Sequence, residues 1–84
     1  MILSGIAMKL HPIQVHAYSG YKADERPIRF EHEGQEHMIR EIVNQTLEEI
    51  VGNGLRNKFT VRTEEGKIFT LFHEEIKDQW FLEE

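Results

Sequence analysis

The carboxyl-terminal stretch 58–82 constrains the fold most strongly, because its apolar residues alternate with polar ones on both sides of a single turn sequence. Residues 63–66 are typical of a type I turn that ends in a left-handed glycine. The resulting three-residue loop sets two pairs of apolar residues opposite each other: Phe59 with Leu71, and Val61 with Phe69. A two-residue loop would instead oppose Arg62 to Phe69, so the longer loop is favoured. One face of this hairpin is therefore apolar.

A second turn, near residues 75–78, is predicted to extend the hairpin into a three-stranded meander. Trp80 and Leu82 alternate with Phe81 after that turn, which is the period of a strand with one buried face. Trp80 is the only tryptophan, and in a domain of this size we expect it to close the core. The meander is a folding core and carries no obvious active site.

Chain length and composition exclude several classes of protein. The 84 residues make one domain that buries about 60–65% of its unfolded surface, which leaves little room for a deep substrate cavity. Cysteine is absent, which excludes disulfides, thiolate nucleophiles and cysteine-ligated metals and fits a cytoplasmic location. The apolar start is too short for a secretory core or a membrane span. We expect residues 1–10 to be a disordered extension, with Met8 as a possible natural start, and residues 11–84 to form the domain.

Charge is distributed unevenly along the chain. The net charge is −5, yet residues 1–30 hold four lysine or arginine residues and two acidic ones, whereas residues 31–84 hold six and thirteen. A surface that meets an anion is therefore expected in the first part of the chain. The acidic remainder is typical of a solvated face that opposes edge pairing.

The first half of the domain is predicted to form two strands. Apolar residues alternate with polar ones over residues 13–18, a loop follows, and Pro27 restarts an extended segment. Ile28 and Phe30 would share one face. The sequence of residues 31–35 resembles the 63–67 turn, and a three-residue loop with a left-handed glycine would set Ile28 against Met38. The two-residue alternative opposes Glu31 to Glu36, a repulsive pair.

Residues 37–51 fit two interpretations. The apolar residues follow a helical spacing, and a strand through them needs a bulge: Ile39, Ile42, Val43, Leu47 and Ile50. Thr46 and Glu49 have the spacing of a capping box, and Gly52 can end a helix. The compromise is a strand to about Asn44 followed by a helical turn over 47–51.

These patterns predict a mainly β fold. It is a small antiparallel sheet or partly open SH3-like barrel of about five strands with one short helical turn. The alternative is an α+β domain in which residues 38–51 are helical and pack on the meander.

The combined pattern resembles a family of short bacterial proteins of unassigned function. The most specific segments are the Tyr-Ser-Gly-Tyr-Lys and Glu-Arg-Pro motifs within residues 18–27 and the meander over 59–82. The resemblance covers about residues 15–82 and is weak over 45–57, where Thr46 stands in place of a frequent tryptophan. It favours a strand over residues 37–44. Similar segments beside DNA-repair polymerase-like domains imply an accessory role near nucleic acid, and the family supplies no catalytic residues.

One constellation is a candidate binding site. Aromatic rings and cations interleave in and beside the loop 18–27: Tyr18, Tyr21, Lys22, Arg26 and Arg29. A nucleic-acid base could stack on tyrosine while the cations contact phosphates, at about 1–3 kcal/mol per stacked base. The structural alternative is that Tyr18 packs at the edge of the core, Arg26 pairs with Asp24 or Glu25, and the loop merely connects two strands.

The histidines predict no metal or catalytic site. His32 and His37 flank an acidic turn, but their spacing matches no tight ligand motif, and we expect solvated turn residues. His73 precedes Glu74 and Glu75, yet no nucleophile or oxyanion donor is near it in sequence. We therefore predict no metal, no cofactor and no catalytic residue.

The sequence favours a non-catalytic interaction module that uses the loop 18–27. Its partner would be another protein, bound by edge-strand addition or by loop contact, and not a membrane. Weak binding of single-stranded nucleic acid by the same loop is the alternative. An enzyme is not expected, and the oligomeric state stays open.

Overall fold

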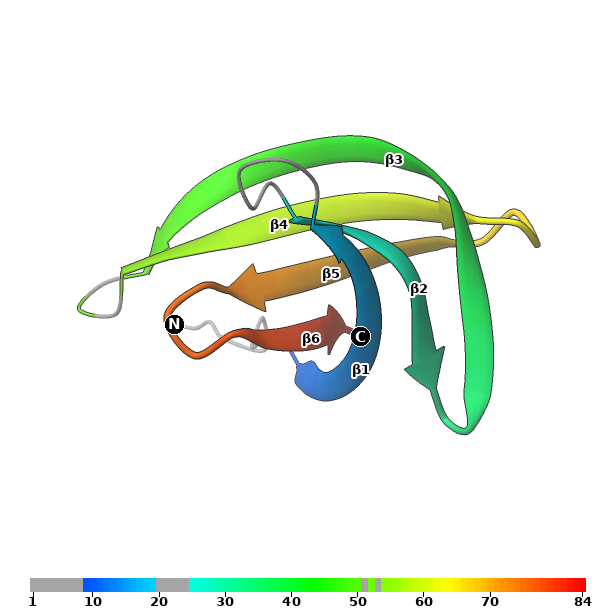
Figure 1. The fold of residues 1–84 in the computed structure, drawn as a ribbon, viewed down its shortest axis with the longest axis horizontal. Helices are drawn as coiled ribbons and strands as arrows, with labels where there is room; N and C mark the ends of the chain where they lie inside the picture. The colour runs from blue at the N-terminus through cyan, green and yellow to red at the C-terminus, as the bar shows by residue number, and fades with distance from the viewer. Residues whose placement is uncertain (1–8, 20–24, 51, 53) are drawn as a thin grey trace, which may run out of the picture.

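The chain forms a closed antiparallel barrel in a computed structural model that describes residues 9–19, 25–50, 52 and 54–84. Each strand pairs with the next, and the first also pairs with the last (Figure 1). The strands are β1 (Leu10–Ser19), β2 (Glu25–His32), β3 (Gln35–Ile50), β4 (Gly54–Thr63), β5 (Ile68–Glu74) and β6 (Gln79–Glu83). The predicted small β barrel is confirmed, although it is closed and has six strands. The described residues contain no helix, so the predicted helical turn and the helical alternative for 38–51 are both wrong.

The carboxyl-terminal meander has the predicted register. Phe59 pairs with Leu71 and Val61 with Phe69, and Gly66 has the expected left-handed backbone, with φ of 90°. The loop is held by backbone hydrogen bonds from the Thr63 N–H to the Lys67 carbonyl (2.8 Å) and from the Gly66 N–H to the Thr63 carbonyl (2.9 Å). The alternating pattern therefore predicted the strand register of this half of the barrel correctly.

Strand β3 is continuous where a helix was an open interpretation. Its pairing with β4 skips Arg40 and Val43, which marks two bulges. Each bulge shifts the alternation by one residue, so Ile39 and Ile42 both pack against the core although they lie three residues apart. Two bulges in a strand thus reproduce the spacing of a helical stripe. Beyond them, Leu47 is 59% exposed, so the apolar series does not form one buried face.

The turn between β2 and β3 differs from the prediction. Arg29 pairs with Met38 and Glu31 with Glu36, so the loop has two residues and the predicted Ile28–Met38 pairing is wrong. Glu33 and Gly34 have φ of 54° and 75°, the signature of a type I′ turn, whose twist suits a hairpin. An ion pair between Arg29 Nε and a Glu36 carboxylate oxygen (3.1 Å) offsets the repulsion that counted against this register.

Glu33→Asn is expected to stabilise the protein by about 0.5–1 kcal/mol, because asparagine tolerates the left-handed backbone better than glutamate does. Urea denaturation followed by circular dichroism measures the difference. Glu65→Asn is the matched control, since Glu65 precedes the glycine of the other hairpin loop without a positive φ. Equal effects at both positions would contradict the two-residue turn.

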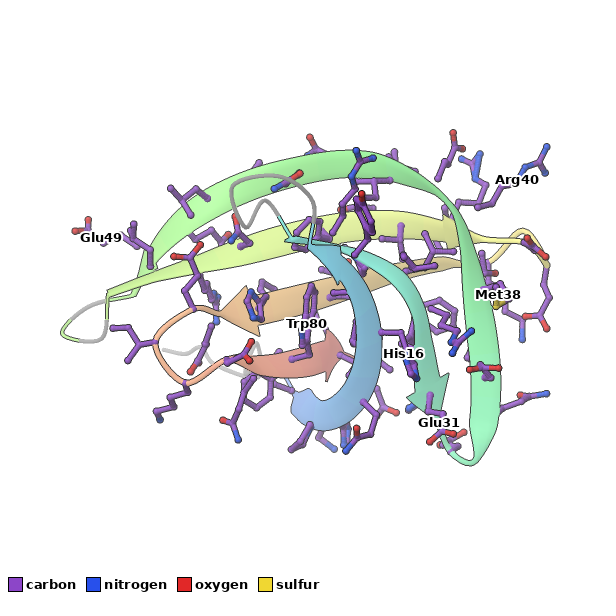
Figure 2. All side chains as sticks on the ribbon, viewed as in Figure 1. His16, Glu31, Met38, Arg40, Glu49 and Trp80 are labelled. Atoms are coloured by element: carbon purple, nitrogen blue, oxygen red, sulfur yellow. The ribbon has the colours of Figure 1, made fainter. Side chains whose placement is uncertain are left out.

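The core lies inside the barrel, and all six strands contribute to it. Its buried members are Phe30, Phe59, Val61, Leu71, Trp80 and Leu82, and partly buried residues of β1 and β3 pack against them. Trp80 points into the barrel in Figure 2, whereas Arg40 and Glu49 lie on its outside. The expectation that the tryptophan closes the core is confirmed.

Strand β1 closes the barrel by changing partners along its length. Residues 10–13 pair with β6, and residues 14–19 pair with β2; the Glu84 N–H adds a hydrogen bond to the Lys9 carbonyl (2.9 Å). Strand β1 begins one residue before the predicted domain start, and residues 1–8 of the predicted extension lie outside the described residues. Among the described residues, no helix has the length and apolar character needed to cross a membrane.

Candidate functional site

The predicted binding loop joins β1 to β2, and the structure describes its two ends. Tyr21 and Lys22 lie outside the described residues. Tyr18 lies near the end of β1, and Arg26 and Arg29 lie on β2. Three of the five predicted site residues can therefore be placed.

Tyr18 and Arg26 form a directly opposed pair across β1 and β2. Tyr18 is 59% exposed and Arg26 is also exposed, so both side chains lie on the outside of the barrel. The alternative in which Tyr18 packs at the core edge is therefore wrong. Beside them runs a second outward row, in which Arg29 of β2 stands between His16 of β1 and Met38 of β3.

A bulge in β2 explains how these residues share one surface. The pairing passes from Arg29 opposite His16 to Pro27 opposite Ala17, which leaves Ile28 as the extra residue. Phe30 is consequently buried while Ile28 is 42% exposed, so the prediction that the two share a face is wrong. We call the resulting surface the Tyr18 face, and it consists of His16, Tyr18, Arg26, Ile28, Arg29 and Met38.

The two arginines of the Tyr18 face differ in their ion pairs. Arg29 pairs with Glu36, and both side chains are 40–50% exposed, so the pair contributes about 0–1 kcal/mol to stability. Among the carboxylates whose side chains the structure describes, none forms an ion pair with Arg26. Asp24, one of its two predicted partners, lies outside the described residues, and so does the side chain of Glu25, the other. Of the two arginines, Arg26 is thus the one that the described side chains do not neutralise.

Sequence reasoning missed three members of this surface. His16 alternates with Tyr18, and that spacing alone could have identified it. Ile28 and Met38 could not be found in this way, because their positions depend on the β2 bulge and on the two-residue turn. The surface is therefore less loop-like and more apolar than the predicted site.

His37 belongs to the core. It is 4% exposed and stacks on Phe30, with ring centroids 5.1 Å apart, so the expectation of a solvated turn residue is wrong for this histidine. The type I′ turn is the reason, because it sets His37 directly opposite Phe30 on the inner face. His32 follows Phe30 by two residues on β2, so it lies on the same face as His37 but at the end of the strand, where it is less buried.

His73 is held by an acid other than the two beside it in sequence. Its Nε2 lies 2.9 Å from an Asp78 oxygen, and its ring stacks on Trp80 with centroids 4.4 Å apart. Glu75 instead accepts a hydrogen bond from the Asn57 amide. The histidine is 5% exposed, which is typical of a packed and oriented core residue.

A hollow of about 430 Å³ opens between β1 and the start of β6. Asp78 and Trp80 line it; among the described residues, its lining does not include His73 or any serine, threonine or cysteine. The arrangement gives His73 and Asp78 no nucleophile to activate within this hollow. That the chain is not an enzyme stays a prediction.

The resemblance to short bacterial proteins likewise stays a prediction. Searches for related families, related curated proteins and related solved structures found no match to this chain.

Proposed function

We propose that this chain is a non-catalytic interaction module whose Tyr18 face binds an acidic segment of a partner protein. The observation that carries the proposal is the outward cross-strand pair of Tyr18 and Arg26. The proposed contact surface lies on the strands beside the loop and not on the loop alone.

The residue types of the Tyr18 face support a binding role. Tyrosine, methionine and arginine are enriched at the centres of protein interfaces. Three apolar or amphipathic side chains are exposed close together here: Tyr18 at 59%, Ile28 at 42% and Met38 at 39%. A tyrosine offers a rigid ring and a hydroxyl group, so it can pack against a partner and still form a hydrogen bond.

Charge defines the chemistry of the partner. The chain carries −5 overall, so most of its surface repels an acidic segment. Arg26 and Arg29 are on the Tyr18 face, with the acidic pair Glu31 and Glu36 in the next row of the same sheet. An acidic partner would therefore be oriented with its carboxylates towards Tyr18 and away from Glu31 and Glu36.

Single-stranded nucleic acid is a second candidate, which the same residues favour. A base could stack on the exposed ring of Tyr18 while Arg26 contacts a phosphate. Such binding would weaken steeply with added salt, because counterions are released from the phosphates. A protein contact that buries apolar surface is less sensitive to salt.

Tyr18→Ala is expected to weaken binding of an acidic dodecapeptide with two tryptophans about 5–30-fold, the equivalent of about 1–2 kcal/mol for a central interface residue. Arg26→Ala is expected to act in the same direction. Fluorescence anisotropy with the labelled peptide, and in parallel with a labelled ten-residue oligothymidylate, measures both affinities at low and moderate salt.

Leu47→Ala is the matched control, since Leu47 is as exposed as Tyr18, at 59%, but lies on the long β3–β4 hairpin. The control should bind like the wild type. Binding of the oligonucleotide alone, with strong salt dependence, would favour the second candidate. Peptide binding that Tyr18→Ala leaves unchanged would contradict a role for this face.

A further inference from the structure

A mixed histidine and carboxylate cluster lies where the barrel closes. His32 ends β2, Glu33 follows it in the turn, and Glu84 follows β6. One ligand atom from each of these three side chains lies within 4.8 Å of the others. His32 Nε2 is 3.9 Å from a Glu33 oxygen and 3.8 Å from a Glu84 oxygen. Two chain segments more than fifty residues apart thus bring three donor groups together.

We propose that His32, Glu33 and Glu84 form a binding site for one divalent transition-metal ion, with Zn²⁺ as the best fit. Imidazole nitrogen favours zinc over magnesium or calcium, and carboxylate oxygens are common zinc ligands. In a tetrahedral zinc site, ligand atoms are roughly 3.3–3.5 Å apart. The distances of 3.8 and 3.9 Å from His32 are close to this spacing. The ligand atoms of the two carboxylates lie within 4.8 Å of each other, so side-chain rotation has to bring them closer together around the ion.

Charge also favours a cation at this position. Glu33 and Glu84 bring two carboxylates to the same histidine, and like charges this close repel each other. The ion pairs found within the described residues link neither acid to a lysine or arginine; their partners are His11 and His32. A divalent ion between the two carboxylates would replace that repulsion with attraction.

His11 acts as a positioning residue for Glu84. Its Nε2 lies 3.0 Å from one Glu84 oxygen, whereas His32 faces the other oxygen. The backbone is fixed as well, since the Glu84 N–H bonds to the Lys9 carbonyl. Partners that hold a ligating carboxylate in this way raise metal affinity, and losing one typically costs 10–100-fold.

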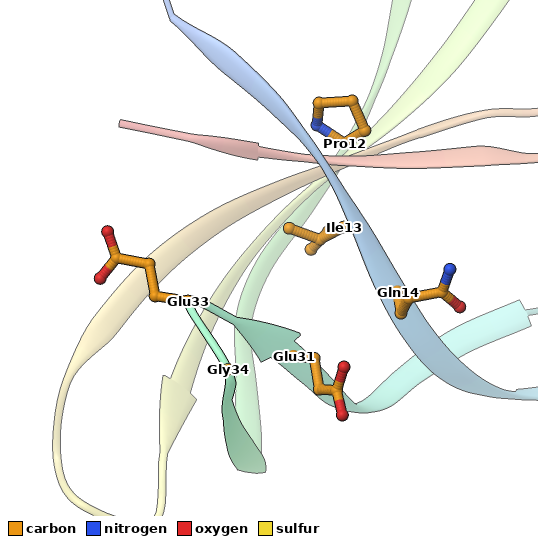
Figure 3. Close-up of a pocket in the computed structure, with 6 residues that line it drawn as sticks. All are labelled: Pro12, Ile13, Gln14, Glu31, Glu33 and Gly34. Atoms are coloured by element: carbon orange, nitrogen blue, oxygen red, sulfur yellow. The ribbon is translucent and has the colours of Figure 1, made fainter.

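The site has space beside it for a further ligand. A hollow of about 240 Å³ is lined by Pro12, Ile13 and Gln14 of β1 and by Glu31, Glu33 and Gly34 at the end of β2 and its turn. Figure 3 shows the β1 residues on one side of this hollow and the acidic turn on the other. Three protein ligands leave a fourth zinc position for water or a small anion, and Glu33 places the ion next to this space.

Isothermal titration calorimetry of the full chain with zinc chloride tests the proposal. We expect one zinc ion per chain, at least about tenfold tighter than Mg²⁺, and at least a 100-fold loss of affinity in Glu84→Gln and in His32→Ala. His11→Ala should lose about 10–100-fold, and His11→Gln, which keeps a hydrogen-bond donor, should recover part of it. Amide spectra of each variant report whether it is folded.

His16→Ala is the matched control. His16 is an exposed histidine on β1, the strand that also carries His11, but it lies outside the cluster. This variant should bind zinc like the wild type. Three results would overturn the site: no zinc binding by the wild type, unchanged zinc binding by Glu84→Gln and His32→Ala, or loss of zinc binding in His16→Ala. Glu84→Gln decides the matter alone if His32→Ala fails to fold, since the Glu84 side chain is 44% exposed.

Discussion

Phe30→Ala is expected to destabilise the protein by about 3–5 kcal/mol, the usual cost of truncating a buried phenylalanine. Phe30 is fully buried, stacks on His37 and meets Phe69 edge to face, with ring centroids 5.2 Å apart. A domain of this size has a total stability of about 4–12 kcal/mol. The variant should therefore be partly or wholly unfolded at room temperature, and urea denaturation followed by circular dichroism measures the loss.

Ile28→Ala is the matched control on the same strand. Ile28 is 42% exposed because the β2 bulge turns it outward, so we expect a loss below about 1 kcal/mol. An unbroken strand would place both residues on one face and give two large losses. Comparable losses for the two variants would thus contradict the bulge, and with it the composition of the Tyr18 face.

Trp80→Ala is expected to have an effect of similar size, about 3–5 kcal/mol. Trp80 is 8% exposed and contacts residues of both β4 and β5. Its ring centroid lies 4.4 Å from that of His73 and 5.5 Å from that of Phe59. Its loss also uncovers the His73–Asp78 pair. Thermal and urea denaturation of the variant measure the free energy of unfolding.

Two further variants test whether the loss of stability comes from the burial of Trp80 or from any substitution in this region. Trp80→Phe keeps a stacking ring and should lose clearly less than the alanine variant. Ile76→Ala lies in the adjoining turn, where Ile76 is 78% exposed, and should change stability by less than about 0.5 kcal/mol. A tolerated Trp80→Ala would contradict a core that depends on this residue.

The carboxyl-terminal half of the fold was predictable because nothing interrupts its alternation. From Phe59 to Leu71 the inward residues are apolar except for the buried Thr63 beside the loop, and the loop has a glycine where a left-handed backbone is needed. Local pattern and final structure therefore agree. The strand count and the length of β3 were harder to predict from the sequence, because bulges at Arg40 and Val43 imitate the period of a helix.

The β2–β3 turn shows how a local electrostatic argument can mislead. Opposing Glu31 to Glu36 disfavours the two-residue loop in isolation. The structure adopts it nevertheless, since it buries Phe30 against His37 and lets Arg29 pair with Glu36. Burial of an aromatic pair stabilises the register by more than the repulsion between two exposed carboxylates destabilises it.

The candidate sites were predictable only where they are local in sequence. The neighbourhood of Tyr18 and Arg26 could be anticipated, because both flank one loop and strands joined by a loop pair across it. The cluster of His32, Glu33 and Glu84 could not be, since it depends on the pairing of the first strand with the last. No spacing of residues along the chain predicts that closure.

Strand β1 closes the barrel by pairing with β6, and nuclear Overhauser effects between these two strands test this closure most directly. Leu10 pairs with Glu83 and Ile13 with Trp80, so we expect cross-strand backbone contacts at both ends of this ladder, together with slow amide exchange in its hydrogen-bonded positions. The contradicting result is a spectrum in which β2 to β6 show their ladders, but residues 10–13 exchange rapidly and contact none of residues 80–83. It would exclude the closed barrel and remove the basis of the proposed metal site.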